Sequence, residues 1–89
     1  MKRIELDIRN IATREALHIY LQYMLDLPAY YGRNLDALND LLSCESEEME
    51  IVLYAKGCAS EEMQAYLPKL KRAMQDAAQE NQRVRIVEG

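Results

Sequence analysis

Residues 51–55, with the sequence IVLYA, form a short and uninterrupted apolar run. A run of this kind is typical of a strand that is covered on both faces, as in the middle of a small parallel sheet. Residues 2–8 and residues 83–86 alternate apolar and charged side chains instead, which is the pattern of strands with one face in water. The sequence therefore predicts one buried central strand and two half-exposed strands.

Apolar residues recur at helical spacing in the two segments that follow the first strand. The first helix is expected over residues 13–25, with Pro28 ending it, because the residue before a proline is pushed out of helical geometry. Gly32 then allows a tight turn, and Asn34 is a good N-cap for a second helix that ends near Ser43. The predicted buried positions of these two helices are Leu17, Tyr20, Leu21, Met24, Leu25, Leu35, Leu38, Leu41 and Leu42.

A third helical segment follows the central strand. Ser60 is its expected N-cap, and the carboxylates of Glu61 and Glu62 suit the positive end of the helix dipole. Pro68 lacks a backbone donor within this segment, so we expect a kink or a division into two helices there. The predicted buried positions are Met63, Tyr66, Leu67, Leu70, Ala73, Met74 and Ala77.

The order of these elements along the chain determines the topology. Crossovers that contain helices return each strand in the same direction, and their right-handed sense places all the helices on one side of the sheet. We therefore expect a two-layer α/β fold, with three parallel strands, residues 51–55 in the middle and the helices packed on one face. The 89 residues suffice for one small domain, residues 1–89, without a large cleft.

The acidic side chains are concentrated in the middle of the chain. Residues 34–62 contain eight of them and a single lysine, which gives this segment a charge of −7, whereas the remaining residues sum to +3. An acidic region repels phosphate backbones and attracts basic surfaces. Direct binding to nucleic acid is therefore disfavoured, and a cationic partner is favoured.

Other classes of site receive little support from the sequence. Cys44 and Cys58 lie fourteen positions apart and His18 is the sole histidine, so we expect reduced thiols and no metal or cofactor. His18, at the edge of the apolar stripe of the first helix, is expected to be packed or solvated rather than catalytic. The N-terminal residues lack the apolar stretch of a secretory signal, and no segment is long enough to span a membrane, so we expect a cytoplasmic protein.

Residues 27–42, LPAYYGRNLDALNDLL, combine leucines at helical spacing with an unusual polar set. Asp36 and Asp40 lie four positions apart, hence on one helical face opposite the leucines, where their repulsion costs about 0.2 to 0.5 kcal/mol. Acidic residues on an outer face often serve only solvation, and tyrosines beside a helix start, here Tyr30 and Tyr31, often belong to the core. Rigid aromatic side chains beside fixed carboxylates are, however, also typical of binding hot spots. Together these residues favour a protein contact.

This segment resembles the central segment of the barstar family, intracellular inhibitors of secreted bacterial ribonucleases. The family pattern L-P-x-Y-Y-G-x-N-L-D-A-L-x-D-x-L is matched at each of its twelve fixed positions. The chain length and the predicted order of elements also agree with the family, whereas similarity outside this segment is one of pattern rather than identity. The matched residues are Leu27, Pro28, Tyr30, Tyr31, Gly32, Asn34, Leu35, Asp36, Ala37, Leu38, Asp40 and Leu42.

The resemblance implies that this loop and helix plug the active site of a ribonuclease. Asp40 would occupy the position of an RNA phosphate and accept hydrogen bonds from catalytic Arg and His residues, with Asp36 beside the same cationic patch. Tyr30 would lie against the catalytic histidine. The other residues that the resemblance assigns to the contact are Tyr31, Gly32 and Asn34, which shape the loop, Asn39 on the same helix, and Asp76 in the last helix.

The chain also departs from the family at several positions. It has no tryptophan, and Asn39 stands where the family carries one within the helix, while polar residues replace another in the loop of residues 43–50. Arg33 introduces a positive charge where an acidic residue occurs in the family. These changes leave the central plug intact and alter its rim, so the cognate nuclease can differ from that of other members.

Two other functions remain open on the sequence alone. An enzyme could use Asp36, Asp40 and the acidic residues 45–50 as metal or acid-base groups, although no paired nucleophile and base and no glycine-rich phosphate loop accompany them. A barstar-like fold could instead bind a different basic protein, such as another toxin or a regulator. We favour a ribonuclease inhibitor that is not an enzyme and is a monomer when free. Residues 45–50 could also be a plain solvated connection.

Overall fold

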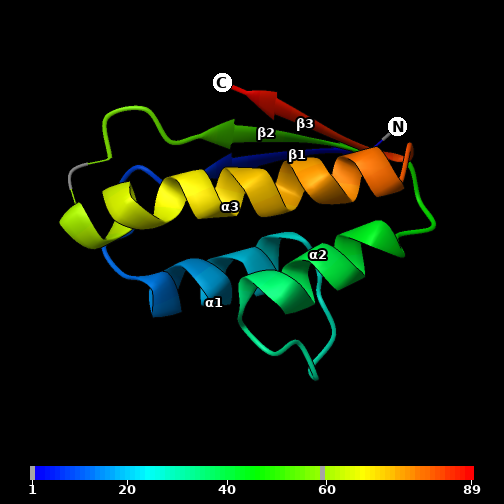
Figure 1. Ribbon diagram of the computed structural model, residues 1–89, viewed down its shortest axis with the longest axis horizontal. Helices are drawn as coiled ribbons and strands as arrows, with labels where there is room; N and C mark the ends of the chain where they lie inside the picture. Colours follow the sequence, from blue (N-terminus) through cyan, green and yellow to red (C-terminus); the bar gives the residue numbers. More distant parts are fainter. Residues whose placement is uncertain (1, 59) are drawn as a thin grey trace.

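The computed structural model describes residues 2–58 and 60–89, which contain three strands and three helices (Figure 1). The strands are β1 (Lys2–Asp7), β2 (Met49–Tyr54) and β3 (Val84–Glu88). The helices are α1 (Arg14–Met24), α2 (Leu35–Ser43) and α3 (Glu61–Glu80). Their order along the chain is β1, α1, α2, β2, α3, β3, as the sequence predicts.

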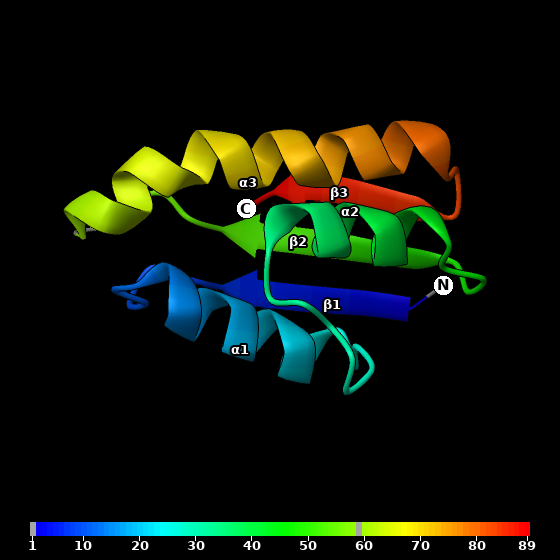
Figure 2. The ribbon, with the colours of Figure 1, turned by 60° about the horizontal axis from the view of Figure 1, so that its bottom comes forward.

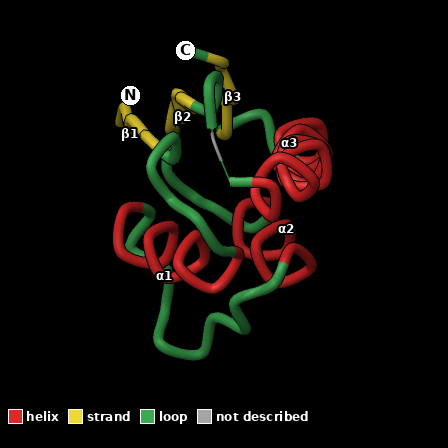
Figure 3. The backbone as a smooth tube through the Cα atoms, turned by 90° about the vertical axis from the view of Figure 1, so that its left-hand side faces the viewer, coloured by secondary structure: helices red, strands yellow, loops and turns green. Residues whose placement is uncertain are grey.

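The three strands form one parallel sheet with β2 in the middle (Figure 2). The register places Leu6 of β1 opposite Leu53 of β2, and Ile51 of β2 opposite Ile86 of β3. All three helices lie on the same side of this sheet (Figure 3). The predicted two-layer α/β fold is therefore confirmed, including the central position of the apolar run.

The two faces of the sheet are covered differently. The inner face packs against the helices, and the outer face carries charged side chains around Val52, which is nevertheless only 4% exposed. Glu50 lies 3.9 Å from the guanidinium groups of both Arg3 and Arg85, and the hydroxyl of Tyr54 donates to Glu5 at 2.7 Å. On this face β2 carries Glu50, Val52 and Tyr54, so the central strand alternates as well, and Val52 alone continues its apolar run on the outer side. The expectation that the central strand is apolar on both faces is therefore wrong except at Val52.

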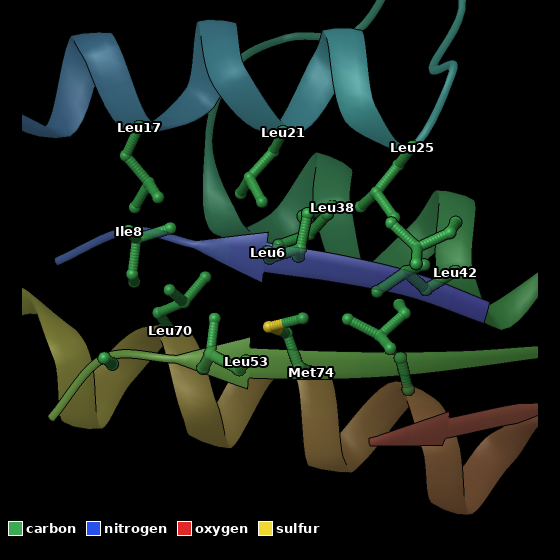
Figure 4. Close-up of a cluster of buried hydrophobic side chains, with 14 of the residues drawn as sticks. Leu6, Ile8, Leu17, Leu21, Leu25, Leu38, Leu42, Leu53, Leu70 and Met74 are labelled. Atoms are coloured by element: carbon green, nitrogen blue, oxygen red, sulfur yellow. The ribbon is translucent and has the colours of Figure 1, made fainter. Parts of the chain in front are cut away.

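The hydrophobic core lies between the sheet and the helices (Figure 4). Most of the positions predicted from helical spacing are buried or packed against buried residues. The side chains labelled in the close-up come from the three helices, from β1 and β2, and from the residues directly after β1 and α1: Leu6, Ile8, Leu17, Leu21, Leu25, Leu38, Leu42, Leu53, Leu70 and Met74. In the part of the chain that the structure describes, no helix combines the length and apolar composition needed to cross a membrane.

Each helix begins at a capping side chain that satisfies a free backbone donor. Thr13 accepts from the N–H of Ala16, and the predicted caps Asn34 and Ser60 accept from residues 37 and 63 respectively. The end of α1 is where the sequence predicts it, with Met24 as the last helical residue and Leu25 as the C-cap. Pro28 is not its direct cause, because the chain already leaves helical geometry at Asp26, whose φ is 52°.

Two details of the backbone bear on the sequence predictions. In the tight turn expected at Gly32, the residue with a positive φ, 54°, is Arg33. Of the two outcomes expected at Pro68, a division into two helices is wrong, because α3 is continuous from Glu61 to Glu80. The expected kink agrees with Figure 2, in which the helix axis changes direction in the first half of α3, and Pro68 is exposed, so water can reach the carbonyl group of the preceding turn that lacks its usual donor.

Candidate functional site

The outer face of α2 presents two exposed carboxylates, those of Asp36 and Asp40. The opposite face buries Leu38 and Leu42 in the core, which fixes the rotation of the helix about its own axis. Among the residues that the structure describes, no ion pair within 4 Å involves either aspartate. Neither carboxylate therefore has a neutralising partner among the described residues.

A surface hollow of about 410 Å³ is lined by residues of α2 and of the second half of α3. It contains three of the residues predicted for the contact, Asp36, Asn39 and Asp76, whereas Asp40 lies one helical turn further along α2 and does not line it. No lysine or arginine is among the described residues that line this hollow. Two helices therefore converge on one acidic depression beside Asp40. Its complete lining is Leu35, Asp36, Asn39, Ala73, Asp76, Gln79 and Glu80.

Glu80 is a member of this hollow that the sequence reasoning missed. It lies four positions after Asp76 on α3, which is the same one-turn spacing that connects Asp36 and Asp40 on α2. The spacing of Asp76 and Glu80 was available in the sequence. Its meaning depends on the packing of α3 against α2, which no local pattern specifies.

Asn39 faces the protein and not only the solvent. Its side-chain amide donates to the backbone carbonyl of Ala73 at 3.0 Å and thereby connects α2 to α3. A second amide performs the same task at the other end of α2, where Asn81 donates to the carbonyls of Leu42 and Glu45 at 3.0 and 2.8 Å. These contacts hold the acidic face of α2 at a fixed distance from Asp76.

The two neighbouring tyrosines before α2 have opposite environments. The side chain of Tyr30 is 81% exposed, whereas that of Tyr31 is only 5% exposed and belongs to the core. Tyr31 therefore cannot contact a partner with its ring unless it leaves the core. Its position agrees with the predicted role of shaping the loop. Gly32 is exposed, and a methyl group in place of its hydrogen would lie 3.0 Å from the side-chain nitrogen of Asn34.

The loop between α1 and α2 is braced by Gln22 of α1. The amide nitrogen of Gln22 donates to the carbonyl of Pro28 at 3.0 Å, and its amide oxygen accepts from the guanidinium of Arg33 at 3.3 Å. A backbone bond from Tyr31 N–H to the carbonyl of Pro28 closes the turn between them. Arg33 thus supports the loop through its contact with α1.

A second brace passes through His18, whose side chain is only 2% exposed. Its Nδ1 lies 2.6 Å from the hydroxyl of Tyr31 in the loop, and its Nε2 lies 2.8 Å from the hydroxyl of Tyr66 in α3. Burial lowers the pKa of His18 below its ordinary value of 6.5 and raises the pKa values of both tyrosines, so the neutral forms of all three are favoured. The expectation that His18 is a packed residue is confirmed. No pattern in the neighbouring sequence indicated that His18 supports the loop.

Another hollow, of about 560 Å³, lies next to His18 on the other side of the loop. Its charged lining has both signs, with Arg14 and Arg33 against Glu15 and Glu62, and Arg14 lies 3.6 Å from Glu62. The acidic hollow between α2 and α3 has no such compensation. Over residues 2–58 and 60–89, no group of three or more His, Cys, Asp or Glu side chains is arranged so that it could hold a metal ion.

Comparison with known proteins places this geometry in context. The sequence model of the family described as "Barstar (barnase inhibitor)" matches residues 1–87. A protein of Bacillus subtilis (strain 168) with the name "Putative ribonuclease inhibitor YrdF" is 51% identical over 43 residues. That alignment covers 48% of this chain and 47% of the relative, so the similarity spans about half the length of the curated protein.

Proposed function

The chain belongs to the barstar family, and we propose that it inhibits a bacterial ribonuclease by placing the acidic face of α2 and the adjoining loop in the active site of the enzyme. One observation supports this most directly. Asp36 and Asp40 lie on a well-anchored helix, form no ion pair with a described residue, and follow a loop in which the ring of Tyr30 is exposed. Such an arrangement weakens the free protein slightly and is useful only when a cationic partner is present.

The chemistry of ribonucleases explains why carboxylates suit this task. Their active sites stabilise negative charge on a phosphoryl group, so they contain several cationic side chains. A carboxylate can accept the hydrogen bonds that an RNA phosphate oxygen would accept, and such charge-assisted bonds are short and strong. Because α2 is already held by Asn34, Asn39 and Asn81, little conformational entropy is lost when the partner binds.

The proposed roles follow the family resemblance and the positions of the side chains. Asp40 takes the place of the phosphate, and Asp36 and Asp76 contact the cationic groups around it. Tyr30 packs against the catalytic histidine of the enzyme. Asn34 caps α2, as the geometry of its side chain requires. The three other predicted residues position the binding surface: Tyr31 and Gly32 act on the loop, and Asn39 acts on the helix.

The proposal includes the compartment and the state of the protein. An inhibitor of a toxic or secreted ribonuclease protects the cell that makes the enzyme, so we place it in the cytoplasm, as a monomer when free and without a cofactor. An enzymatic function has less support, because the members of its family are inhibitors and the carboxylates lack a paired nucleophile or base. A different basic protein partner remains the alternative, and the same acidic face would serve it.

The test is a titration of the purified protein into barnase and into the ribonucleases of the organism that carries this chain. RNA cleavage should fall linearly with added protein until one equivalent is present, and gel filtration should show a one-to-one complex. A parallel pull-down from the lysate and secretome of the host distinguishes the alternative. If the retained proteins include no ribonuclease and none of the enzymes is inhibited, the proposal is wrong.

A further inference from the structure

His18 connects three elements that are far apart in the sequence. It lies on α1, it contacts Tyr31 in the loop before α2, and it contacts Tyr66 in α3. The ring centroid of Tyr31 lies 5.9 Å from the imidazole centroid, and that of Tyr66 lies 5.8 Å from it. The ring of Tyr66 is nearly edge-on to the imidazole. The imidazole is therefore enclosed by the aromatic rings as well as bonded by their hydroxyl groups.

The position of Tyr31 makes this contact relevant to binding. Tyr31 directly follows Tyr30, the exposed aromatic side chain of the proposed contact, and directly precedes the residues that lead to the cap of α2. The buried hydroxyl of Tyr31 thus anchors the loop from below while Tyr30 points to solvent. Without this anchor the loop would retain its hydrogen bonds with Gln22 and the bond from the Asn34 amide to the carbonyl of Gly32.

Protonation of the imidazole is incompatible with this arrangement as it stands. A neutral imidazole has one N–H and one lone pair, so one tyrosine hydroxyl accepts from the ring and the other donates to it. When the ring binds a proton from solvent, both nitrogens become donors. The hydroxyl that had donated must then rotate to accept. For Tyr31, which is 5% exposed, the hydroxyl proton then needs a new acceptor in the core, whereas Tyr66 lines the open hollow next to His18.

The charged groups around His18 do not offer a compensating anion. From α1 the neighbours are Arg14 and Glu15, from the loop Arg33, and from α3 Glu62, besides the two tyrosines. Glu62 already accepts from the backbone N–H of Arg14 at 2.7 Å and pairs with its guanidinium, which also lies 5.6 Å from the ring of Tyr66. No carboxylate of a described residue lies within hydrogen-bonding distance of the imidazole.

We propose that His18 is a positioning residue for the binding loop, and that protonation of its imidazole releases Tyr31 and weakens the binding of the ribonuclease. The release of the loop is a property of the free protein. The effect on binding rests on the proposed function. Acidification thus converts the inhibitor from a pre-organised form to one that must order its loop on binding.

The direction of the pH dependence follows from the two states. Burial holds the pKa of His18 in the folded protein below 6.5, the ordinary value that applies to the unfolded chain. Below pH 6.5 the unfolded chain therefore binds more protons than the folded protein, and the free energy of unfolding falls as the pH is lowered. This fall continues until the pH reaches the folded-state pKa, below which both states are protonated.

The first experiment uses the free protein and needs no partner. Because the chain has a single histidine, its carbon-bound imidazole protons can be followed by NMR without assignment ambiguity. We expect a titration midpoint below pH 6.5, and with the same midpoint a change in the ring signals of Tyr31 and faster amide exchange in residues 29–33. A midpoint at or above 6.5, or loop signals that do not change through the titration, would overturn the proposal.

The second experiment compares the protein with the variant His18→Gln against barnase between pH 7.5 and 5. The glutamine amide offers one donor and one acceptor but does not titrate in this range. Below the His18 midpoint, the dissociation constant of the parent should rise by up to about tenfold per pH unit relative to that of the variant, as for one linked proton. Taking the ratio removes the titration of the nuclease itself.

Equal pH profiles of the two proteins would overturn the proposed effect on binding. If circular dichroism shows that His18→Gln does not fold, the NMR titration of the unmodified protein still decides whether the loop is released. If barnase and the host ribonucleases are not inhibited at any pH, the proposed function fails, whereas the release of the loop in the free protein stands or falls by the NMR result alone.

Discussion

Replacing Asp40 with alanine separates the contribution of the acidic face to stability from its contribution to binding. The carboxylate is exposed, forms no ion pair with a described residue and repels Asp36 one turn away. Its removal relieves about 0.2 to 0.5 kcal/mol of repulsion and introduces a better helix former by up to about 0.7 kcal/mol. The variant Asp40→Ala should therefore be as stable as the parent or up to about 1 kcal/mol more stable.

The effect on binding should be much larger and of opposite sign. If Asp40 accepts hydrogen bonds from buried cationic groups of a ribonuclease, its truncation leaves those groups unpaired, which typically costs about 2 to 5 kcal/mol. That range corresponds to a dissociation constant raised roughly 30-fold to several thousand-fold. The loss should appear mainly as faster dissociation, because most of the long-range attraction remains in place.

The assay combines urea unfolding with stopped-flow and competition measurements on the ribonuclease that the titration identifies. Glu48→Ala is the matched control, because it removes the same charge from an exposed side chain that lies outside α2. The control should change the dissociation constant by less than about fivefold, or 1 kcal/mol. If Asp40→Ala and Glu48→Ala weaken inhibition equally, net charge and not phosphate mimicry accounts for the binding.

Three further predictions follow from the contacts described above. Asn81→Ala removes three hydrogen bonds, to Leu42, Glu45 and Arg83, and should lower the free energy of unfolding by about 2 to 4 kcal/mol in a urea titration; a loss below about 1 kcal/mol would show that α2 is held by other means. Tyr30→Ala should leave the unfolding midpoint unchanged and weaken inhibition by at least about tenfold, since its ring is exposed in the free protein. Raising the salt concentration should slow association more than it speeds dissociation in stopped-flow measurements, because screening acts beyond about 8 to 10 Å at moderate ionic strength; a salt-independent association rate would exclude steering by the acidic face.

The sequence predicted the fold well because each level of the pattern agreed with the others. The apolar run of β2, the alternation in β1 and β3, and the caps Asn34 and Ser60 each required little knowledge of the rest of the molecule. Parallel crossovers of fixed handedness then left one arrangement of the layers. Local rules left other details open. The sequence did not decide between a kink and a division at Pro68, where α3 stays continuous, and it did not indicate that Arg33 is the left-handed residue of the turn at Gly32.

The candidate site was predictable only in part, for a different physical reason. Asp36 and Asp40 share a face by helical geometry alone, so their spacing was informative. The opposite environments of Tyr30 and Tyr31 could not be read from two adjacent identical letters, because burial depends on where α1 and α3 lie. The same holds for Asn39 and Glu80, whose roles follow from the packing of α2 against α3. Local patterns specify faces of elements, and only tertiary packing decides what those faces meet.

The anchors of α2 share a property that bears on how such a surface can change partners. Asn39, Asn81 and the contact of His18 with Tyr31 all act on the inner side of the helix and loop, and none of them uses Asp36, Asp40 or Tyr30. Asp36, Asp40 and Tyr30, which we propose as the most direct contacts, can therefore be substituted without loss of these hydrogen bonds. Arg33 differs from them, because its guanidinium donates to Gln22 and so also supports the loop. Because rigidity is supplied from inside, the acidic face can change one residue at a time without a loss of pre-organisation.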